Sequence, residues 1–430
     1  MLIVVAILAL SFLIIVHELG HFAVAKWSDV KVLEFSLFMG PKLFSIKRGE
    51  TLYSIRAIPL GGFVRMEGEE ETSDDARAYN RKPLLTRAAV IIAGPVMNLV
   101  VAIIILVIIV TATGYRTTGI RKVEPTSPAY EAGLQAGDTI LKYDNRKILH
   151  PADIYLFLFG SGGKPADVVI QRGNETKTIK ITPEVLQKNR YILGFTPKES
   201  YGEGSNVIEA VSENPATNID KFKADDKIIA LNGVPVSNGR EIRSFLKQSK
   251  GESINVTVLR GTEEKNLAIK PVIDNNEEQF DIGVDFLGEK SGIFGSVKHS
   301  IIYAASISRN VYYSFVWLIT GRVSLSQLSG PVGIVTTIGD VVQQSPTFVD
   351  KLLNLFSLMA FIGINLGLFN LIPIPALDGS KLLFIAIEGI RKKAIPPEKE
   401  ALISMVGFVL LIALMIFTTY NDILRKISGG

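Results

Sequence analysis

Three ionisable residues interrupt an apolar segment at the start of the 430-residue chain. Residues 1–16 carry no charged side chain, and His17, Glu18 and His21 follow them in the sequence HELGH. Residues four positions apart lie on one face of a helix, so both imidazoles can reach a single metal ion. Two histidines suit Zn2+, and Glu18 beside them is placed to serve as general acid and base. A solvated helix end is the alternative, but ionisable groups in an apolar segment are costly without a partner such as a metal.

A third zinc ligand is expected, because catalytic zinc sites commonly combine three protein ligands with one open position for water. Glu34 is a nearby acidic candidate. Asp378, in the sequence NLIPIPALDGS, is favoured because Pro373 and Pro375 interrupt helical hydrogen bonding just before it. Irregular backbone within a membrane persists only where it is packed in protein or lines a polar cavity. We therefore predict Asp378 as the third ligand, with a plain helix-ending turn as the alternative.

Four segments are apolar and long enough to cross a membrane, which takes about 20 apolar residues per helix. Buried core helices could explain one such segment, but four of them favour a polytopic α-helical membrane protein. A cleaved signal peptide is disfavoured, because no basic residue precedes the first apolar run and no small-residue cleavage site follows it before His17. The predicted transmembrane helices are residues 1–26, 88–115, 351–378 and 401–421.

The distribution of Lys and Arg predicts the topology. These residues gather in two connecting segments, 27–87 and 379–400, while the N-terminal end has none. The positive-inside rule then places both segments in the cytoplasm. Residues 116–350 and the tail at 422–430 lie on the outer side, so the predicted active site is near the cytoplasmic face of the membrane.

Residues 291–350 are predicted to form interfacial amphipathic helices and a connector. Their apolar stretch is interrupted by Lys298, His299 and Arg309, and cations within a membrane helix are costly. A further crossing here would also make the first and third predicted spans antiparallel. The two histidines and the aspartate could then not meet.

Composition excludes several classes of protein. The chain has no cysteine, which rules out cysteine nucleophiles, disulfides and cysteine-bound zinc. The net charge of +4 is too small to indicate nucleic acid as a partner. The lipid bilayer is the partner that the apolar segments indicate.

Residues 122–148 resemble residues 210–236, which predicts an internal repeat with a period of about 88 residues. The GLQAGD turn and the order of strands resemble PDZ domains. Residues 116–198 and 199–290 are therefore predicted to form two β-rich PDZ-like domains. The sequences LGF and IGV resemble the strand to which a PDZ domain adds an extended peptide. Two β-rich spacers without a ligand are the alternative.

HELGH, NLIPIPALDG, GPVMN and IPLGGFVRM, with PDZ-like units between the second and third spans, resemble the site-2 protease family of intramembrane zinc metalloproteases. The likeness covers essentially the whole chain and is strongest to the bacterial regulator-of-sigma-E type. It implies that His17, His21 and Asp378 bind Zn2+ and that Glu18 is the catalytic acid and base. Substrate-binding or supporting roles are implied for Asn370, Pro373, Pro375 and Asn98.

The resemblance also implies a substrate class. Such enzymes cleave single-pass membrane proteins already trimmed by another protease, such as an anti-sigma factor, and remnant signal peptides. Residues 51–66 alternate in strand fashion, and we predict a membrane-associated β segment that pairs with unwound substrate through Ile55 and Ala57. The PDZ-like pair would act as a size filter or peptide sensor. A membrane-anchored zinc protease for soluble peptides, with Glu34 as a ligand, and a non-enzymatic PDZ adaptor remain alternatives.

Overall fold

The computed structural model divides the chain into two compact units. They are a membrane unit, Met1–Gly114 with Lys290–Ile423, and a β-rich unit, Tyr115–Glu289 with Leu424–Gly430. The structure describes residues 2–428 except 70, 187–189, 199–204, 212–221, 275–278, 326–327 and 346.

Four described helices of the membrane unit are long and apolar enough to span a bilayer: α1 (Leu2–Trp27), α2 (Leu84–Thr113), α8 (Phe348–Asn370) and α10 (Pro397–Ser428). The predicted third span is wrong at its end, because α8 stops at Asn370 and Asp378 begins a separate helix, α9 (Asp378–Arg391). Pro373 and Pro375 lie in the intervening segment, where a missing N–H prevents the helix from continuing.

Two further helices pack against the spans α1, α2 and α8. The helix α6 (Ile293–Ile319) packs on α2 and α8, and its centre contributes Ala304 and Ile307 to their shared apolar cluster. The helix α7 (Pro331–Gln344) packs against α1 and α8. Among the described helices, α6 is not one of the candidate spans. Gly367 permits close packing, since a Cβ there would lie 2.8 Å from the Pro95 carbonyl oxygen of α2.

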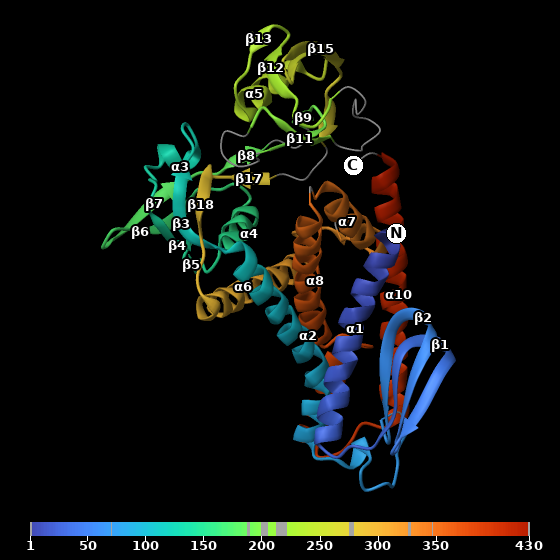
Figure 1. Ribbon diagram of the computed structural model, residues 1–430. Coiled ribbons are helices and arrows are strands. Elements are labelled where there is room, and N and C mark those ends of the chain that lie inside the picture. The colour runs from blue at the N-terminus through green and yellow to red at the C-terminus, as the bar shows by residue number, and fades with distance from the viewer. Residues whose placement is uncertain are drawn as a thin grey trace. The chain divides into compact units, whose positions relative to one another are not determined.

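A folded β hairpin precedes α2 and lies beside α1 (Figure 1). Its long strands, β1 (Val32–Arg48) and β2 (Thr51–Met66), bend so that four segments lie side by side in the order 62–66, 32–37, 51–56 and 42–48. Ile55 pairs with Leu37 on one side and with Phe44 on the other. Both sides of Ile55, for which pairing with a substrate was predicted, are thus already occupied by partners within the hairpin. The short helix η1 (Tyr79–Arg81) follows the hairpin.

The β-rich unit contains two larger sheets, and the chain returns from the second sheet to the first at its last strand. The first has the order β18-β3-β4-β6-β7, with β5 on β4, and the second the order β13-β12-β14-β15. Three two-stranded pairs complete the unit, β10-β11, β16-β9 and β17-β8. The first sheet and its helices are β3 (Tyr115–Val123), α3 (Pro128–Glu131), β4 (Thr139–Tyr143), β5 (Arg146–Lys147), α4 (Pro151–Ser161), β6 (Ala166–Arg172), β7 (Glu175–Ile181) and β18 (Val284–Glu289). The remaining elements are β8 (Glu184–Leu186), β9 (Arg190–Ile192), β10 (Phe195–Pro197), β11 (Ile208–Val211), β12 (Lys227–Leu231), β13 (Val234–Pro235), α5 (Gly239–Ser249), β14 (Ile254–Arg260), β15 (Glu263–Ile269), β16 (Val272–Asp274) and β17 (Gln279–Asp281).

The strand pairing in this unit is nested, because the strands of the second sheet lie in the sequence between two paired strands of the first. The last strand, β18, pairs with the first, β3, while Leu193 belongs to the core of the second sheet. These contacts cross the predicted division between residues 116–198 and 199–290. Within each sheet the same ion pair recurs 88 residues apart: Arg172 binds Asp138, and Arg260 binds Asp226, each with an N···O distance of 2.7 Å.

Candidate metal centre

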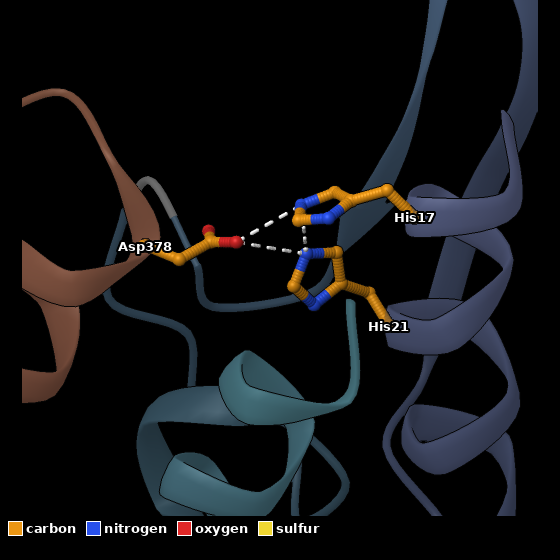
Figure 2. Close-up of side chains that lie close together, drawn as sticks. All are labelled: His17, His21 and Asp378. Atoms are coloured by element: carbon orange, nitrogen blue, oxygen red, sulfur yellow. Dashed lines mark hydrogen bonds and ion pairs between the residues drawn. The ribbon is translucent and has the colours of Figure 1, made fainter. Parts of the chain in front are cut away.

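Two helices bring the three predicted ligands together at one point. His17 and His21 lie on α1, and Asp378 is the first residue of α9, as Figure 2 shows. The Asp378 Oδ2 atom lies 3.0 Å from His17 Nε2 and 3.3 Å from His21 Nε2. The two imidazole Nε2 atoms are 3.1 Å apart. Both histidines are buried.

This triangle of atoms fits a zinc ion. A Zn–N distance of about 2.0–2.1 Å places the ligand atoms of a tetrahedral site about 3.3–3.4 Å from one another. The three observed separations are close to that edge length, and two imidazoles with one carboxylate form a usual catalytic zinc donor set. Among the residues that the structure describes, this is the one group of His, Asp and Glu found with such spacing.

Glu34 has a different role from the one considered for it. Its buried carboxylate accepts hydrogen bonds from Ser54 Oγ at 2.7 Å and from Arg56 Nη2 at 2.9 Å. Burial raises the pKa of Glu34, but the hydrogen bonds from Arg56 and Ser54 outweigh burial and hold the pKa below its usual range. Glu34 therefore stabilises the β hairpin as an ionised group and is not part of the metal centre.

Contacts from α2 orient both imidazoles. His21 Nδ1 lies 2.8 Å from the Val90 carbonyl oxygen, to which it donates when Nε2 is a ligand. His17 Nδ1 lies 3.4 Å from the side-chain amide of Asn98, whose Oδ1 has no partner. Turning that amide over places Oδ1 to accept from His17 Nδ1–H. Asn98, for which the family resemblance implied a supporting role, thus lies beside a predicted zinc ligand.

Two glycines make room for this arrangement. A Cβ on Gly94 of α2 would lie 2.3 Å from His21 Nε2 and 2.9 Å from His17 Cε1. A Cβ on Gly379 would lie 2.1 Å from the Ile372 carbonyl oxygen, so the turn that presents Asp378 requires glycine. The role of Gly94 and that of the Val90 carbonyl were not predicted. The available signal was the Gly-Pro pair of GPVMN inside an apolar helix, which indicates close backbone approach.

A cavity of about 250 Å³ adjoins the ligands. It is lined by Ile14, His17, Glu18, Leu366, Asn370, Ala376, Leu377 and Asp378. Asn370, which was predicted to bind substrate, is one of these lining residues. Pro373 and Pro375 do not line this cavity, and a Cβ on Gly407 of α10 would lie 2.2 Å from Pro375 Cβ. Pro375 therefore packs against α10.

The Glu18 carboxylate is hydrogen-bonded to the hairpin. Glu18 Oε2 accepts a hydrogen bond of 3.1 Å from the backbone N–H of Val64. A Zn2+ ion held by His17, His21 and Asp378 would polarise a peptide carbonyl and lower the pKa of a water toward ~7. Glu18, on the cavity wall one residue from His17, would then be placed to accept a proton from a water in the cavity and to deliver it to the leaving amine.

Comparisons with known proteins identify the class. Residues 5–414 match the model of peptidase family M50. The chain therefore belongs to this family, the site-2 proteases, and is a zinc metalloprotease.

Relatives align with it from end to end. A protein of Clostridium perfringens named as a zinc metalloprotease is 32% identical, over 99% of this chain and 100% of its own length. Zinc metalloprotease RasP of Geobacillus kaustophilus is 30% identical, over 97% of this chain and 96% of its own. Regulator of sigma-W protease RasP of Bacillus subtilis is 29% identical, over 97% of both chains.

Proposed function

We propose that this zinc metalloprotease cleaves peptide bonds within the transmembrane segments of single-pass membrane proteins. The observation that carries the proposal is the position of the metal centre. Two of its ligands lie on the candidate span α1, α2 orients their rings, and residues of α8 line the adjoining cavity. A substrate that reaches a site built from three spans is itself a membrane segment.

The β hairpin provides the means to hold an unwound substrate. A transmembrane helix satisfies its own carbonyls, so it must open before a peptide bond can be attacked. Segment 62–66 forms an outer edge of the folded hairpin, and its Val64 N–H points at Glu18. We assign substrate pairing to this edge, in place of Ile55 and Ala57, because strand addition here brings the substrate backbone to the catalytic carboxylate.

The name of one relative supports a substrate class. The Bacillus subtilis relative is named for regulation of sigma-W. We propose that this chain likewise acts on anti-sigma-type proteins after another protease has trimmed them, and on remnant signal peptides. The Lys- and Arg-rich segments support a metal centre near the cytoplasmic side of a bacterial inner membrane. In this proposal the PDZ-like residues 116–290 lie on the outer side and act as a size filter.

Purified protein in liposomes, supplied with a trimmed single-pass substrate, tests this function. We expect cleavage within the membrane segment, loss of cleavage with a zinc chelator, and loss of both zinc and activity in Asp378→Ala. Asp74→Ala is the matched control, because Asp74 is an exposed residue whose surface ion pair with Arg81 contributes little. Cleavage only in the soluble part of the substrate would contradict intramembrane proteolysis.

A further inference from the structure

The chain from Pro59 to segment 62–66 runs along α1 toward the metal centre. The Ser11 hydroxyl donates to the Pro59 carbonyl oxygen at 2.5 Å. A Cβ on Gly61 would lie 3.6 Å from Ile14, and a Cβ on Gly62 would lie 3.8 Å from Glu18 Cγ. The chain therefore follows the helix closely up to the catalytic residue.

The Val64 amide at this edge is already engaged. Its N–H donates to Glu18 Oε2, whereas the residue pairs on its other side with Phe35. A backbone N–H forms one good hydrogen bond, and strand addition depends on such main-chain groups. In this structure the general base and an incoming substrate strand thus require the same donor.

We infer that Glu18 holds the Val64 amide before substrate arrives and that the substrate strand displaces it. A carbonyl of the substrate takes the amide, and the Glu18 carboxylate is released to face the cavity. Substrate pairing and release of the general base are then one event. This inference rests on the proposed function, since it assigns a specific role to the edge that receives the substrate.

Substrate binding to two inactive variants tests the exchange. Glu18→Gln removes the charge but keeps an oxygen that accepts from Val64, whereas Glu18→Met removes charge and acceptor at similar size. The probe is a fluorescent synthetic single-pass peptide with a Gly-Pro pair at mid-helix, titrated against full-length protein in lipid nanodiscs. We expect Glu18→Met to bind about three- to tenfold more tightly than Glu18→Gln, because its Val64 amide is free.

A third substitution shows whether the amide is responsible. Val64→Pro removes the N–H at an edge position that tolerates proline, and it should abolish the difference between the two Glu18 variants. Zinc content, to which Glu18 contributes no ligand, reports that each variant is folded. Equal affinity of the Gln and Met variants, or a difference that persists with Val64→Pro, would overturn the exchange and leave the proposed function intact. Absence of peptide binding in both variants would overturn the proposed function as well.

Discussion

Gly94 provides a stringent test of the metal centre, because it lies on α2 and is not itself a ligand. An alanine Cβ would lie 2.3 Å from His21 Nε2, 2.6 Å from His21 Cε1 and 2.9 Å from His17 Cε1. Normal contact begins at 3.4 Å, so the His21 ring must move by about 1 Å. The backbone of α2 cannot yield easily, since Gly20 of α1 already packs against Ala93.

The expected cost can be estimated from this displacement. Disturbing the groups that orient zinc ligands costs about 10–100-fold in metal affinity, and a shift of about 1 Å costs on the order of 100-fold in rate. We expect Gly94→Ala to weaken zinc binding by about 100-fold or more and to abolish proteolysis. The helix itself should not suffer, because alanine favours a helix over glycine by about 1 kcal/mol.

Zinc affinity, measured by competition with a fluorescent chelator, and substrate cleavage are the assays. Gly389→Ala is the matched control, since Gly389 lies in α9 and a Cβ there would contact Leu84 Cδ1 at an ordinary 3.5 Å. We expect that variant to keep zinc and activity. Wild-type zinc affinity in Gly94→Ala would refute the ligand geometry described here.

Three further predictions concern the rest of the chain. Asp422 of α10 accepts hydrogen bonds from the Gly330 and Gly333 amides at the start of α7. Asp422→Ala should therefore destabilise the protein by about 1–2 kcal/mol in thermal unfolding, and Asp422→Asn by less. Equal melting temperatures of the wild type and Asp422→Ala would contradict a stabilising role for these hydrogen bonds. Burial raises the pKa of Asp138, but the hydrogen bonds from Arg172 and the Gln135 amide hold it below its usual range. The ion pair therefore stabilises the protein above the unfolded pKa of about 3.9 and is lost as the pH falls through the lower folded value. Asp138→Asn should cost about 2 kcal/mol near neutral pH, and this difference should vanish in acid; a constant difference would refute the linkage. Finally, residues 117–287 can be replaced with an Asn-Gly turn between the paired residues Arg116 and Gly288. This deletion should leave the zinc content unchanged and permit cleavage of untrimmed substrates. A continued need for trimming would contradict the proposal that the PDZ-like residues act as a size filter.

The sequence was most informative where chemistry restricts the choice of residue. HELGH has the helical spacing that two zinc-binding imidazoles need. Asp378 comes just after the prolines that interrupt a long apolar segment, and few acidic residues of the chain have such a position. The convergence of His17, His21 and Asp378 could therefore be predicted across more than 350 intervening positions. The apolar spans were predictable for a similar reason, since the bilayer permits few alternatives.

Features that depend on pairing between distant strands could not be predicted. Alternation in residues 51–66 indicates a strand, but it does not show that segment 51–56 lies inside the folded hairpin and segment 62–66 at its edge. The same limit applies to β18, because a local pattern does not name a strand's partner. The need for glycine at position 94 arises only when α1 and α2 are packed together.

The nested strands have a consequence for biosynthesis. The edge strand β18 pairs with β3. The sheet that begins at Tyr115 therefore still lacks this edge strand when the ribosome has translated the second sheet. The domain that starts first is thus finished last, after its neighbour has all of its strands. Until Val284–Glu289 emerges, the apolar face that receives Phe286 stays open, and this nascent intermediate is the stage at which chaperones or premature proteolysis have access to the chain.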